Sequence, residues 1–258
     1  MSIKHYWLNK EQRAEQAKTH VSKMNQQFSK NIDHSVLYTK LYNDFMSETP
    51  HNYKQMKISV QDLDSVSAGM KYSVGGEKVA ILNFASYKNP GGRFLDGSCA
   101  QEECLCHAST LYNVLCRFTI EFYDWNNRNK NRALYHNRAL YTPEIYFYKD
   151  NHIFVCDVIT CAAPNKFAAQ KYANVSDTEN STALQERIKF ILDVAVDNSV
   201  ETLILGAYGC GVFGQDPEEV ATIFKTYLET DYKNSFREVV FAIPDDKNGN
   251  LKAFRKLF

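Results

Sequence analysis

The stretch VAILNFASYKNPGG, residues 79–92, decides the fold, because it joins an unbroken apolar run to a turn with two adjacent glycines. An apolar run without alternating polar residues is typical of a β-strand that is buried on both faces. The runs TLILGA at 202–207 and EVVFAI at 238–243 have the same character. Buried strands of this kind form the middle layer of an α/β fold, in which helices cover both faces of the sheet.

Helical segments alternate with these strands, as an α/β fold requires. Leu184, Ile188 and Ile191 recur at helical spacing, and Asp216 followed by Pro217 is typical of a helix start. We expect helices at 10–30, 31–53, 63–72, 101–117, 182–198, 216–229 and 249–257. We expect further strands at 57–62 and, as a pair joined around Asp150 and Asn151, at 145–160.

Length and composition allow one large domain with an added segment, since the chain has 258 residues, 44% of them hydrophobic. The first part is polar, rich in helix formers and ended by Pro50, which predicts an N-terminal helical accessory region at 1–53. We expect the α/β domain to occupy the rest of the chain, 54–258. The basic, Asn-rich run NNRNKNRALYHNR at 126–138 is expected to be a surface loop of this domain.

The charges exclude a global attraction to nucleic acid or anionic membranes, because 30 basic and 30 acidic residues cancel. No apolar run approaches the roughly 20 residues of a membrane span, and the N-terminus lacks the apolar core of a signal peptide. We therefore expect an intracellular protein, cytoplasmic or nuclear, with no membrane partner. Its seven cysteines are expected to be reduced thiols.

Two glycine-containing loops leave the carboxyl ends of predicted buried strands, where open α/β sheets bind their ligands. One is SYKNPGG at 86–92, and the other is YGCGVFGQDP at 208–217. Glycine backbone approaches a ligand closely, and a helix that starts at Asp216 offers N–H groups that attract anions. The second loop therefore predicts a diphosphate cradle, with a plain strand-to-helix turn as the alternative.

Gln101, Glu102 and Glu103 follow the first loop at the start of a predicted helix. Carboxylates at this position often only complement the helix dipole, and that explanation covers Glu102 well. Beside a glycine loop, however, one of the pair is a candidate catalytic acid. Hydrolysis of a glycosidic bond needs a carboxyl group that gives a proton to the departing oxygen.

These motifs resemble those of the microbial-type poly(ADP-ribose) glycohydrolases, a branch of the macrodomain superfamily. The family signature is a triple glycine, a short spacer and Gln-Glu-Glu, to which GGRFLDGSCAQEE at 91–103 is similar. GAYGCGVFGQDP at 206–217 resembles the diphosphate-binding loop of the family. The resemblance covers most of the chain and implies a macrodomain-like three-layer α/β/α fold with a mixed central sheet and an N-terminal helical extension.

By this resemblance Glu103 is the catalytic acid, and Glu102 bonds the ribose hydroxyls of the unit being cut. Gly91 and Gly92 let the backbone lie against the diphosphate and the distal ribose, against which Phe213 also packs. The other substrate-binding positions that the resemblance implies are Asn83, Ser86, Asn89, Gln101, Gly209, Cys210, Gly211, Val212 and Gly214, with Phe241 or Ile243 at the adenine.

The implied reaction is hydrolysis of the ribose–ribose O-glycosidic bond of poly(ADP-ribose), with release of ADP-ribose. Two alternatives stay open: a reader that binds ADP-ribose without cutting, and a hydrolase that removes single ADP-ribose units from protein or nucleic acid. The two carboxylates argue against a reader, because a pure binder has little use for a buried carboxyl near an anionic ligand. We expect a monomer that needs no cofactor.

Arg93 departs from the family pattern, because it stands where the family has its third glycine. Its side chain either narrows the loop, adds a guanidinium that complements the diphosphate, or faces the solvent. This departure is the one feature of the loop that favours a reader.

Zinc binding is an alternative role for the cysteines near the acid pair. Cys104, Cys106 and His107 form a Cys-x-Cys-His run, with Cys99 and Cys116 close by. Structural zinc sites usually show two spaced pairs of ligands, and no second pair is evident, so we expect no metal site.

Overall fold

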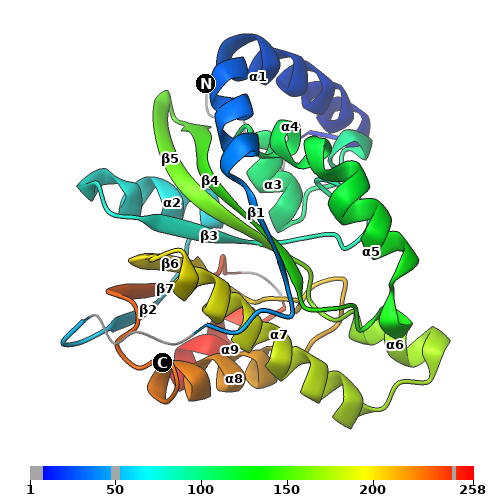
Figure 1. The fold of residues 1–258 in the computed structure, drawn as a ribbon, viewed down its shortest axis with the longest axis vertical. Helices are drawn as coiled ribbons and strands as arrows, with labels where there is room; N and C mark the ends of the chain where they lie inside the picture. The colour runs from blue at the N-terminus through cyan, green and yellow to red at the C-terminus, as the bar shows by residue number, and fades with distance from the viewer. Residues whose placement is uncertain (1–7, 48–52, 246–247) are drawn as a thin grey trace.

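The computed structural model describes residues 8–47, 53–245 and 248–258, which build a seven-stranded mixed sheet (Figure 1). The strand order is β1-β4-β5-β3-β6-β7-β2. Neighbours from β5 to β2 are parallel, whereas β4 is antiparallel to both β5 and β1. The strands are β1 (Lys40–Asn43), β2 (Lys57–Gln61), β3 (Val79–Phe84), β4 (Arg138–Lys149), β5 (His152–Cys161), β6 (Thr202–Leu205) and β7 (Glu238–Ala242).

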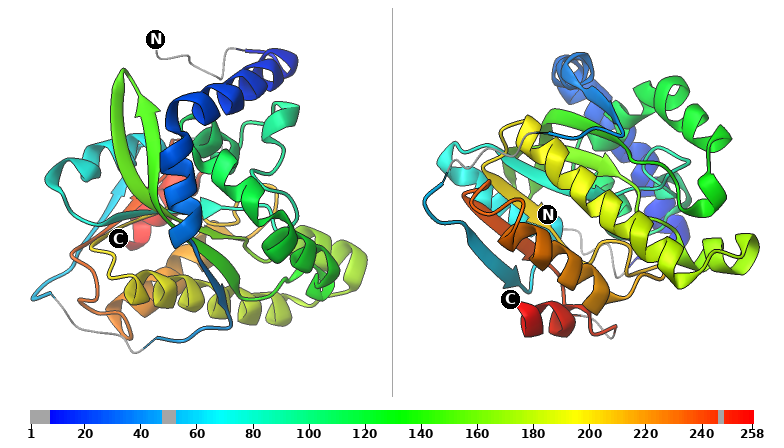
Figure 2. Two further views of the ribbon diagram at one scale, coloured as in Figure 1. Left: turned by 45° about the horizontal axis from the view of Figure 1, so that its top comes forward. Right: turned by 60° about the horizontal axis from the view of Figure 1, so that its bottom comes forward.

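Helices cover both faces of this sheet, which confirms the predicted three-layer architecture. The α-helices are α1 (Lys10–Tyr38), α2 (Ser65–Tyr72), α3 (Gln101–His107), α4 (Leu111–Leu115), α5 (Trp125–Arg128), α6 (Lys166–Ala173), α7 (Asp177–Asp197), α8 (Pro217–Glu229) and α9 (Asn250–Leu257). Shorter 3₁₀ and π turns lie at Ser73–Gly75, Phe94–Asp96, Cys116–Phe118, Thr119–Asp124 and Asn131–Ala133. Helices α7, α8 and α9 cover one face, and α1 to α4 pack on the other (Figures 1 and 2).

Strand β3 shows why its sequence is apolar without alternation. Ala80 and Leu82 belong to the core beneath α7 and α8, whereas Val79 and Ile81 belong to the core beneath α1 and α2. All four side chains are at most 3% exposed. Full burial of a large aliphatic side chain contributes roughly 1.5–3 kcal/mol. The strand is therefore fixed in the middle of the sheet from both sides.

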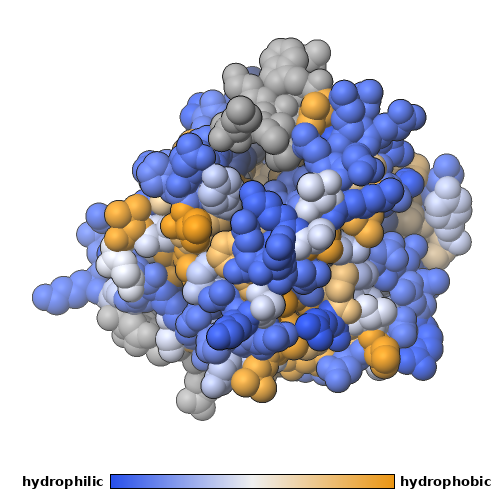
Figure 3. All heavy atoms as spheres, turned by 90° about the horizontal axis from the view of Figure 1, so that it is seen from above, coloured by the Kyte–Doolittle hydropathy of each residue, from blue (hydrophilic) through white to orange (hydrophobic). Residues whose placement is uncertain are grey.

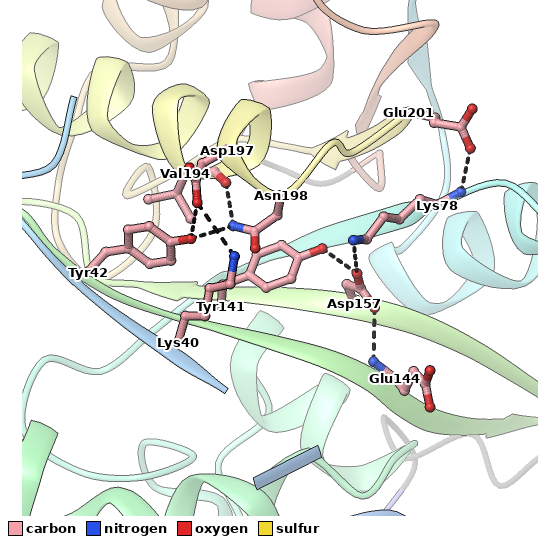
Figure 4. Close-up of polar contacts among 10 residues, drawn as sticks. All are labelled: Lys40, Tyr42, Lys78, Tyr141, Glu144, Asp157, Val194, Asp197, Asn198 and Glu201. Carbon is pink, nitrogen blue, oxygen red and sulfur yellow. Dashed lines mark hydrogen bonds and ion pairs between the residues drawn. The ribbon is translucent and has the colours of Figure 1, made fainter. Parts of the chain in front are cut away.

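The N-terminal region differs from the prediction of helix throughout 31–53. Helix α1 ends at Tyr38, and the chain then forms β1, which pairs with β4. Tyr42 explains why a strand forms here, because its ring is buried and its hydroxyl donates to Asp197 at the end of α7 (Figure 4). Pro50 lies outside the described residues, and the division of the chain at residue 53 stays a prediction.

The prediction of one helix over 101–117 is wrong. Helix α3 ends at His107, and α4 begins at Leu111. Between them the backbone turns to bond β4, since Thr110 N donates to Tyr146 O at 3.0 Å. Hydrogen bonding to a strand that comes later in the chain interrupts the helix, and the period of the apolar residues carries no sign of it.

The stretch 126–138 is not the simple surface loop that its composition predicts. Its first residues belong to α5, and Arg138 is buried at the start of β4. The Arg138 guanidinium lies 4.3 Å from the centre of the Trp125 ring and donates to Glu121 O. A buried charge needs such partners, and they hold this stretch against the sheet.

The remaining predicted strands and helices are confirmed near their expected positions, whereas α6 lies in a stretch for which we predicted no element. The molecular surface on the side that carries α1 is mostly hydrophilic, with hydrophobic side chains in small separate patches (Figure 3). Over the part of the chain that the structure describes, no helix combines the length and the apolar character needed to cross a membrane.

Candidate active site

The two glycine-containing loops lie side by side at the carboxyl ends of two central strands of the sheet, which we call its carboxyl edge. They follow β3 and β6, which are parallel neighbours, so both loops leave the sheet at the same end. Phe84, at the end of β3, packs edge-on against Tyr208 in the second loop, with 5.7 Å between the ring centres. This edge is formed by the carboxyl ends of parallel strands, where α/β proteins bind ligands.

Gln101 fastens helix α3 to the end of β3. Its Oε1 accepts from Phe84 N at 2.9 Å, and its Nε2 donates to Leu82 O at 2.9 Å and to Ser65 Oγ at 3.1 Å. The side chain therefore satisfies the last backbone groups of the strand. The resemblance implies a substrate contact at Gln101, which stays a prediction. In the structure the amide bonds the protein and places the next two carboxylates at the strand end.

Glu102 is buried beneath the first loop, with 3% of its surface exposed. Its Oε1 accepts from Asn83 Nδ2 at 3.1 Å, and its Oε2 accepts from Ser86 N at 2.7 Å. Burial raises the pKa of this carboxyl to about 8, and the nearby Glu103 carboxyl adds to the rise, whereas the N–H donors oppose it. Two predicted substrate contacts, Asn83 and Ser86, thus hold Glu102.

Glu103 is held by two backbone amides, one from each end of the intervening loop. Its Oε1 accepts from Arg93 N at 2.9 Å, and its Oε2 accepts from Ala100 N at 3.0 Å. Only 6% of the residue is exposed. The carboxyl group is therefore fixed at the point where the glycine loop meets the first turn of α3.

Gly92 brings the loop backbone into contact with both carboxyl groups. A Cβ at this position would lie 2.6 Å from Glu103 Oε1 and 2.9 Å from Glu102 Oε2, closer than side chains approach one another. Its φ of +61° is also a conformation that favours glycine. Gly91 has a φ of +64°, and a Cβ there would lie 2.6 Å from Tyr112 Cδ2. Both glycines of the motif are required by the shape of the site.

Position 93 does not require a glycine, because the φ of Arg93 is −113°, which any residue adopts. Its side chain is 65% exposed, and its Nε lies 3.0 Å from Asp96 Oδ2. Of the three possibilities for this residue, the structure shows the solvent-facing one. Its backbone N–H, which donates to Glu103, is the part of the residue that belongs to the site.

The second loop is shaped by glycines and by a buried pair of amide side chains. Gly209 has a φ of +76°, and a Cβ there would lie 2.9 Å from Ala163 Cβ. Gln215 and Asn180 exchange two hydrogen bonds of 2.9 Å, which tie the loop to α7. Gly211, by contrast, has no atom within 4 Å of a Cβ position, so the middle of the loop is open to a ligand.

The sequence predicts that the N-terminus of the helix after this loop is free to bind an anion, but in the structure it is occupied. Asp216 caps α8, and its Oδ1 accepts from Glu218 N at 2.8 Å and from Glu219 N at 3.0 Å. These acidic residues also lie in the first turn of the helix. The loop backbone, rather than the helix end, is therefore the part of 206–217 that is able to hold a diphosphate.

Aromatic rings join the two loops, a feature that the sequence analysis missed. Tyr87 stacks on Tyr135 with 4.1 Å between the ring centres, and Phe213 lies 6.2 Å from Tyr135. Asn126, in α5, donates from its Nδ2 to Tyr87 O at 2.9 Å. Asparagine side chains often bond backbone groups in this way, so the Asn-rich composition of 126–138 was the available signal.

Several predicted substrate contacts lie at the edge of the loops or beneath them. Asn89 is exposed, and Val212 is 84% exposed. Burial raises the pKa of the Cys210 thiol to about 12, which suits a packed thiol rather than a nucleophile. Phe241 is 0% exposed and Ile243 is 3% exposed, both within the core under α8 and α9. An adenine contact by either residue stays a prediction.

A hollow of 920 Å³ lies at the opposite edge of the sheet, near Lys78 and Asp157. Asp157 there accepts from the Tyr141 hydroxyl and from Glu144 N, and Lys78 Nζ lies 3.9 Å away (Figure 4). Burial raises the pKa of Asp157, and these partners oppose the rise. The polar groups of this network satisfy one another, whereas the loops of the carboxyl edge offer open backbone beside two carboxyl groups.

The cysteines near the acid pair do not form a metal-binding group. Within the described ranges, no cluster of three or more His, Cys, Asp or Glu side chains is arranged to hold a metal ion. All seven cysteines lie in those ranges, and none of them is in a disulfide. A hydrogen bond from Cys104 lowers the pKa of Cys99 to about 6, and the positive charge of Arg13 contributes.

Known proteins are similar to this chain in sequence and fold. A family model described as the catalytic domain of microbial-type PARG matches residues 8–150. The poly(ADP-ribose) glycohydrolase of Thermomonospora curvata has a TM-score of 0.88 at 27% identity over 96% of this chain and 100% of its own. Its complex with the inhibitor ADP-HPD gives 0.87 at 28% identity over the same shares. The Deinococcus radiodurans enzyme in complex with ADP-ribose gives 0.80 at 31% identity over 87% and 96%. No curated protein sequence matches the chain.

Proposed function

Since this chain belongs to the microbial-type poly(ADP-ribose) glycohydrolases, a family of glycosidases, we propose that it releases ADP-ribose from poly(ADP-ribose) with Glu103 as the catalytic acid. The scissile ribose lies along the first loop, and the diphosphate lies on the backbone of 209–214. One observation carries this proposal: the backbone at Gly92 runs so close to both buried carboxyl groups that a Cβ there would lie within 2.9 Å of an oxygen of each. A sugar that follows this backbone therefore meets both groups.

Glu103 supplies the proton that the leaving ribose oxygen needs. As the glycosidic bond breaks, the anomeric carbon develops oxocarbenium character, and the Glu103 carboxylate that remains after proton transfer stabilises this positive charge. A water molecule then adds to this carbon and gives a proton to the Glu103 carboxylate, which restores the acid. The amides of Arg93 and Ala100 keep the carboxyl group in place through both steps.

Glu102 orients the sugar in this scheme. Asn83 and Ser86 fix its two oxygens, and the lone pairs that they leave accept hydrogen bonds from the ribose hydroxyls. Because Glu102 also holds the turn at Ser86, it links the position of the sugar to the course of the loop. Glu102 is therefore a substrate-binding residue, and Glu103 is the one that exchanges protons.

The substrate is a polymer in this proposal, and the protein acts as a monomer inside the cell. Support for ADP-ribose as the product comes from the Deinococcus enzyme, whose solved structure contains ADP-ribose. Support for a monomer is the face seen in Figure 3, on which the apolar patches are small and separate. Sedimentation of the purified protein over a range of concentrations tests the monomer directly.

The test of the reaction is the variant Glu103→Gln, which keeps the shape of the side chain and cannot donate a carboxyl proton. We expect the release of ADP-ribose from polymer to fall by roughly 10²–10⁴-fold, the usual contribution of a general acid. ADP-ribose binding, measured by calorimetry, should persist. The matched control is Glu186→Gln, on the exposed side of α7, which should leave the rate unchanged. A Glu103→Gln protein with a near wild-type rate would show that another group donates the proton.

A further inference from the structure

Helix α6 is built against the second glycine loop, although the sequence motifs do not include it. Phe167 N donates to Phe213 O at 3.1 Å. A Cβ placed on Gly214 would lie 3.5 Å from Phe167 Cβ, so the helix and the loop are in contact. Both α5 and α6 lie at the right of Figure 1, at the carboxyl edge of β3. The first turn of α6 therefore continues the surface of the candidate active site.

The outer side of α6 presents two aromatic rings and one ammonium group to the solvent. Phe167 is 56% exposed and Tyr172 is 74% exposed. Lys171 Nζ lies 5.2 Å from the centre of each ring, so the three side chains form one cluster. We call Phe167, Lys171 and Tyr172 the α6 patch. Large rings that stay uncovered beside an active site are candidates for ligand contact.

The charges around the α6 patch leave its ammonium group available. Lys166 Nζ lies 3.1 Å from Asp177, and Arg132 lies 2.6 Å from Glu179, so these nearby cations are already paired. Lys171, among the residues that the structure describes, forms no ion pair. An aromatic face beside a free ammonium group matches a nucleotide, whose base stacks and whose phosphate takes the positive charge.

On the basis of the proposed function, we propose that the α6 patch binds the adenine and phosphate of the ADP-ribose unit on the leaving side of the scissile bond. The resemblance assigns Phe213 to the ribose whose bond is cut, and Phe167, the second residue of α6, donates its N–H to the Phe213 carbonyl. In this proposal the polymer that continues from this ribose on the leaving side passes over α6. The enzyme then prefers polymer to a single ADP-ribose on a carrier, because only polymer supplies a second nucleotide.

Single-stranded nucleic acid offers the same base and phosphate chemistry. The observations favour the ADP-ribose polymer, because the α6 patch adjoins the loop that is assigned to its diphosphate. The balanced charge of the chain also provides no general attraction to nucleic acid. The affinity of the protein for an oligodeoxyadenylate is therefore measured as well, to test whether the α6 patch binds nucleic acid instead.

The experiment compares two double variants that each remove a lysine and a tyrosine. The first, Lys171→Ala with Tyr172→Ala, removes most of the α6 patch and leaves Phe167, whose backbone supports the loop. The second, Lys23→Ala with Tyr148→Ala, is a matched control, since Lys23 Nζ lies 5.8 Å from the Tyr148 ring and Tyr148 is 42% exposed. Values of kcat/KM are measured on polymer and on a mono-ADP-ribosylated peptide.

We expect the first variant to lose about tenfold in kcat/KM on polymer, which is the effect of one lost base stack. Its rate on the peptide and its affinity for free ADP-ribose should stay unchanged, as should all values for the control. Equal losses on both substrates would overturn the proposal, because they would mean that α6 only supports the loop. An unchanged rate on polymer would also overturn it, and more so if affinity for the oligodeoxyadenylate falls.

A binding measurement separates this inference from the proposed function. In a Glu103→Gln background, the α6 substitutions should weaken binding of a short polymer by about tenfold and leave ADP-ribose binding unchanged. If Glu103→Gln alone keeps full activity, the proposed catalytic role fails, while the two affinities still report on the α6 patch. If the two affinities change equally or not at all, the patch is no polymer subsite, whatever the role of Glu103.

Discussion

Replacing Gly92 with alanine should displace the acid pair, Glu102 and Glu103, and so reduce catalysis far more than it reduces the stability of the fold. Gly92 has a φ of +61°, and a non-glycine residue in this conformation costs about 1–2 kcal/mol. The new Cβ would also lie 2.6 Å from Glu103 Oε1, whereas ordinary contact begins at 3.4 Å. The carboxyl group therefore retreats by roughly 0.8 Å, the difference between these distances, or the loop moves away from it.

Such a displacement should affect catalysis far more than stability. A shift of about 1 Å in a catalytic group costs up to about 100-fold in rate, so we expect Gly92→Ala to lose between 10-fold and 100-fold in kcat/KM on polymer. The backbone cost alone lowers the melting temperature by roughly 4 °C in a chain of this size. Release of ADP-ribose and thermal unfolding measure the two effects on the same preparation.

The matched control is Gly76→Ala. Gly76 has a φ of +76°, and a Cβ there meets no atom within 4 Å, so this variant carries the backbone cost without the contact to the carboxyl groups. It should melt a few degrees below wild type and keep its activity. If Gly92→Ala and Gly76→Ala show the same activity, the contact between the loop and the acid pair has no role in catalysis.

Three further perturbations test the surroundings of the site. Folding raises the pKa of Glu102 from 4.5 to about 8, so the free energy of unfolding of the wild type should fall as the pH rises through this range, by roughly 1.4 kcal/mol per pH unit. Urea unfolding of Glu102→Gln should not show this fall. Gln101→Leu removes three hydrogen bonds to β3 and α2 and should lower the free energy of unfolding by about 2–3 kcal/mol. Asn126→Ala releases the Tyr87 carbonyl and should weaken ADP-ribose binding in calorimetry with a loss of about 1 kcal/mol in stability.

Each of these has an outcome that would contradict its physical reason. Parallel stability curves for wild type and Glu102→Gln between pH 5 and pH 9 would mean that burial does not perturb this carboxyl group. A Gln101→Leu protein as stable as wild type would mean that water replaces the lost bonds. Unchanged ADP-ribose affinity in Asn126→Ala would mean that the first loop keeps its course without α5.

The sequence predicts the features that local chemistry decides. An apolar run places β3 between two layers of helices, and adjacent glycines mark the backbone that contacts the acid pair. The cap of α8 shows where such reasoning ends, because Asp216 was expected to open a helix that attracts anions and instead occupies its first amides itself.

Features that depend on partners far apart in the chain could not be predicted. The stack of Tyr87 on Tyr135 joins residues from separate elements, and the break between α3 and α4 depends on the carbonyl of Tyr146. Neither residue type nor spacing encodes these encounters. The placement of Gln101 against β3 belongs to the same class, since the motif marks the residue and only the packing assigns its partners.

The pairing of β1 with β4 has a consequence for anyone who shortens this protein. Strand β1 covers the outer border of β4 from Arg138 to Tyr141 and is locked there by Tyr42. A truncation that begins after β1 would leave those amides and carbonyls open to a second molecule, which is a common origin of strand-to-strand aggregation. During synthesis, too, the segment that emerges first waits for a partner made roughly 100 residues later, a delay that slows folding.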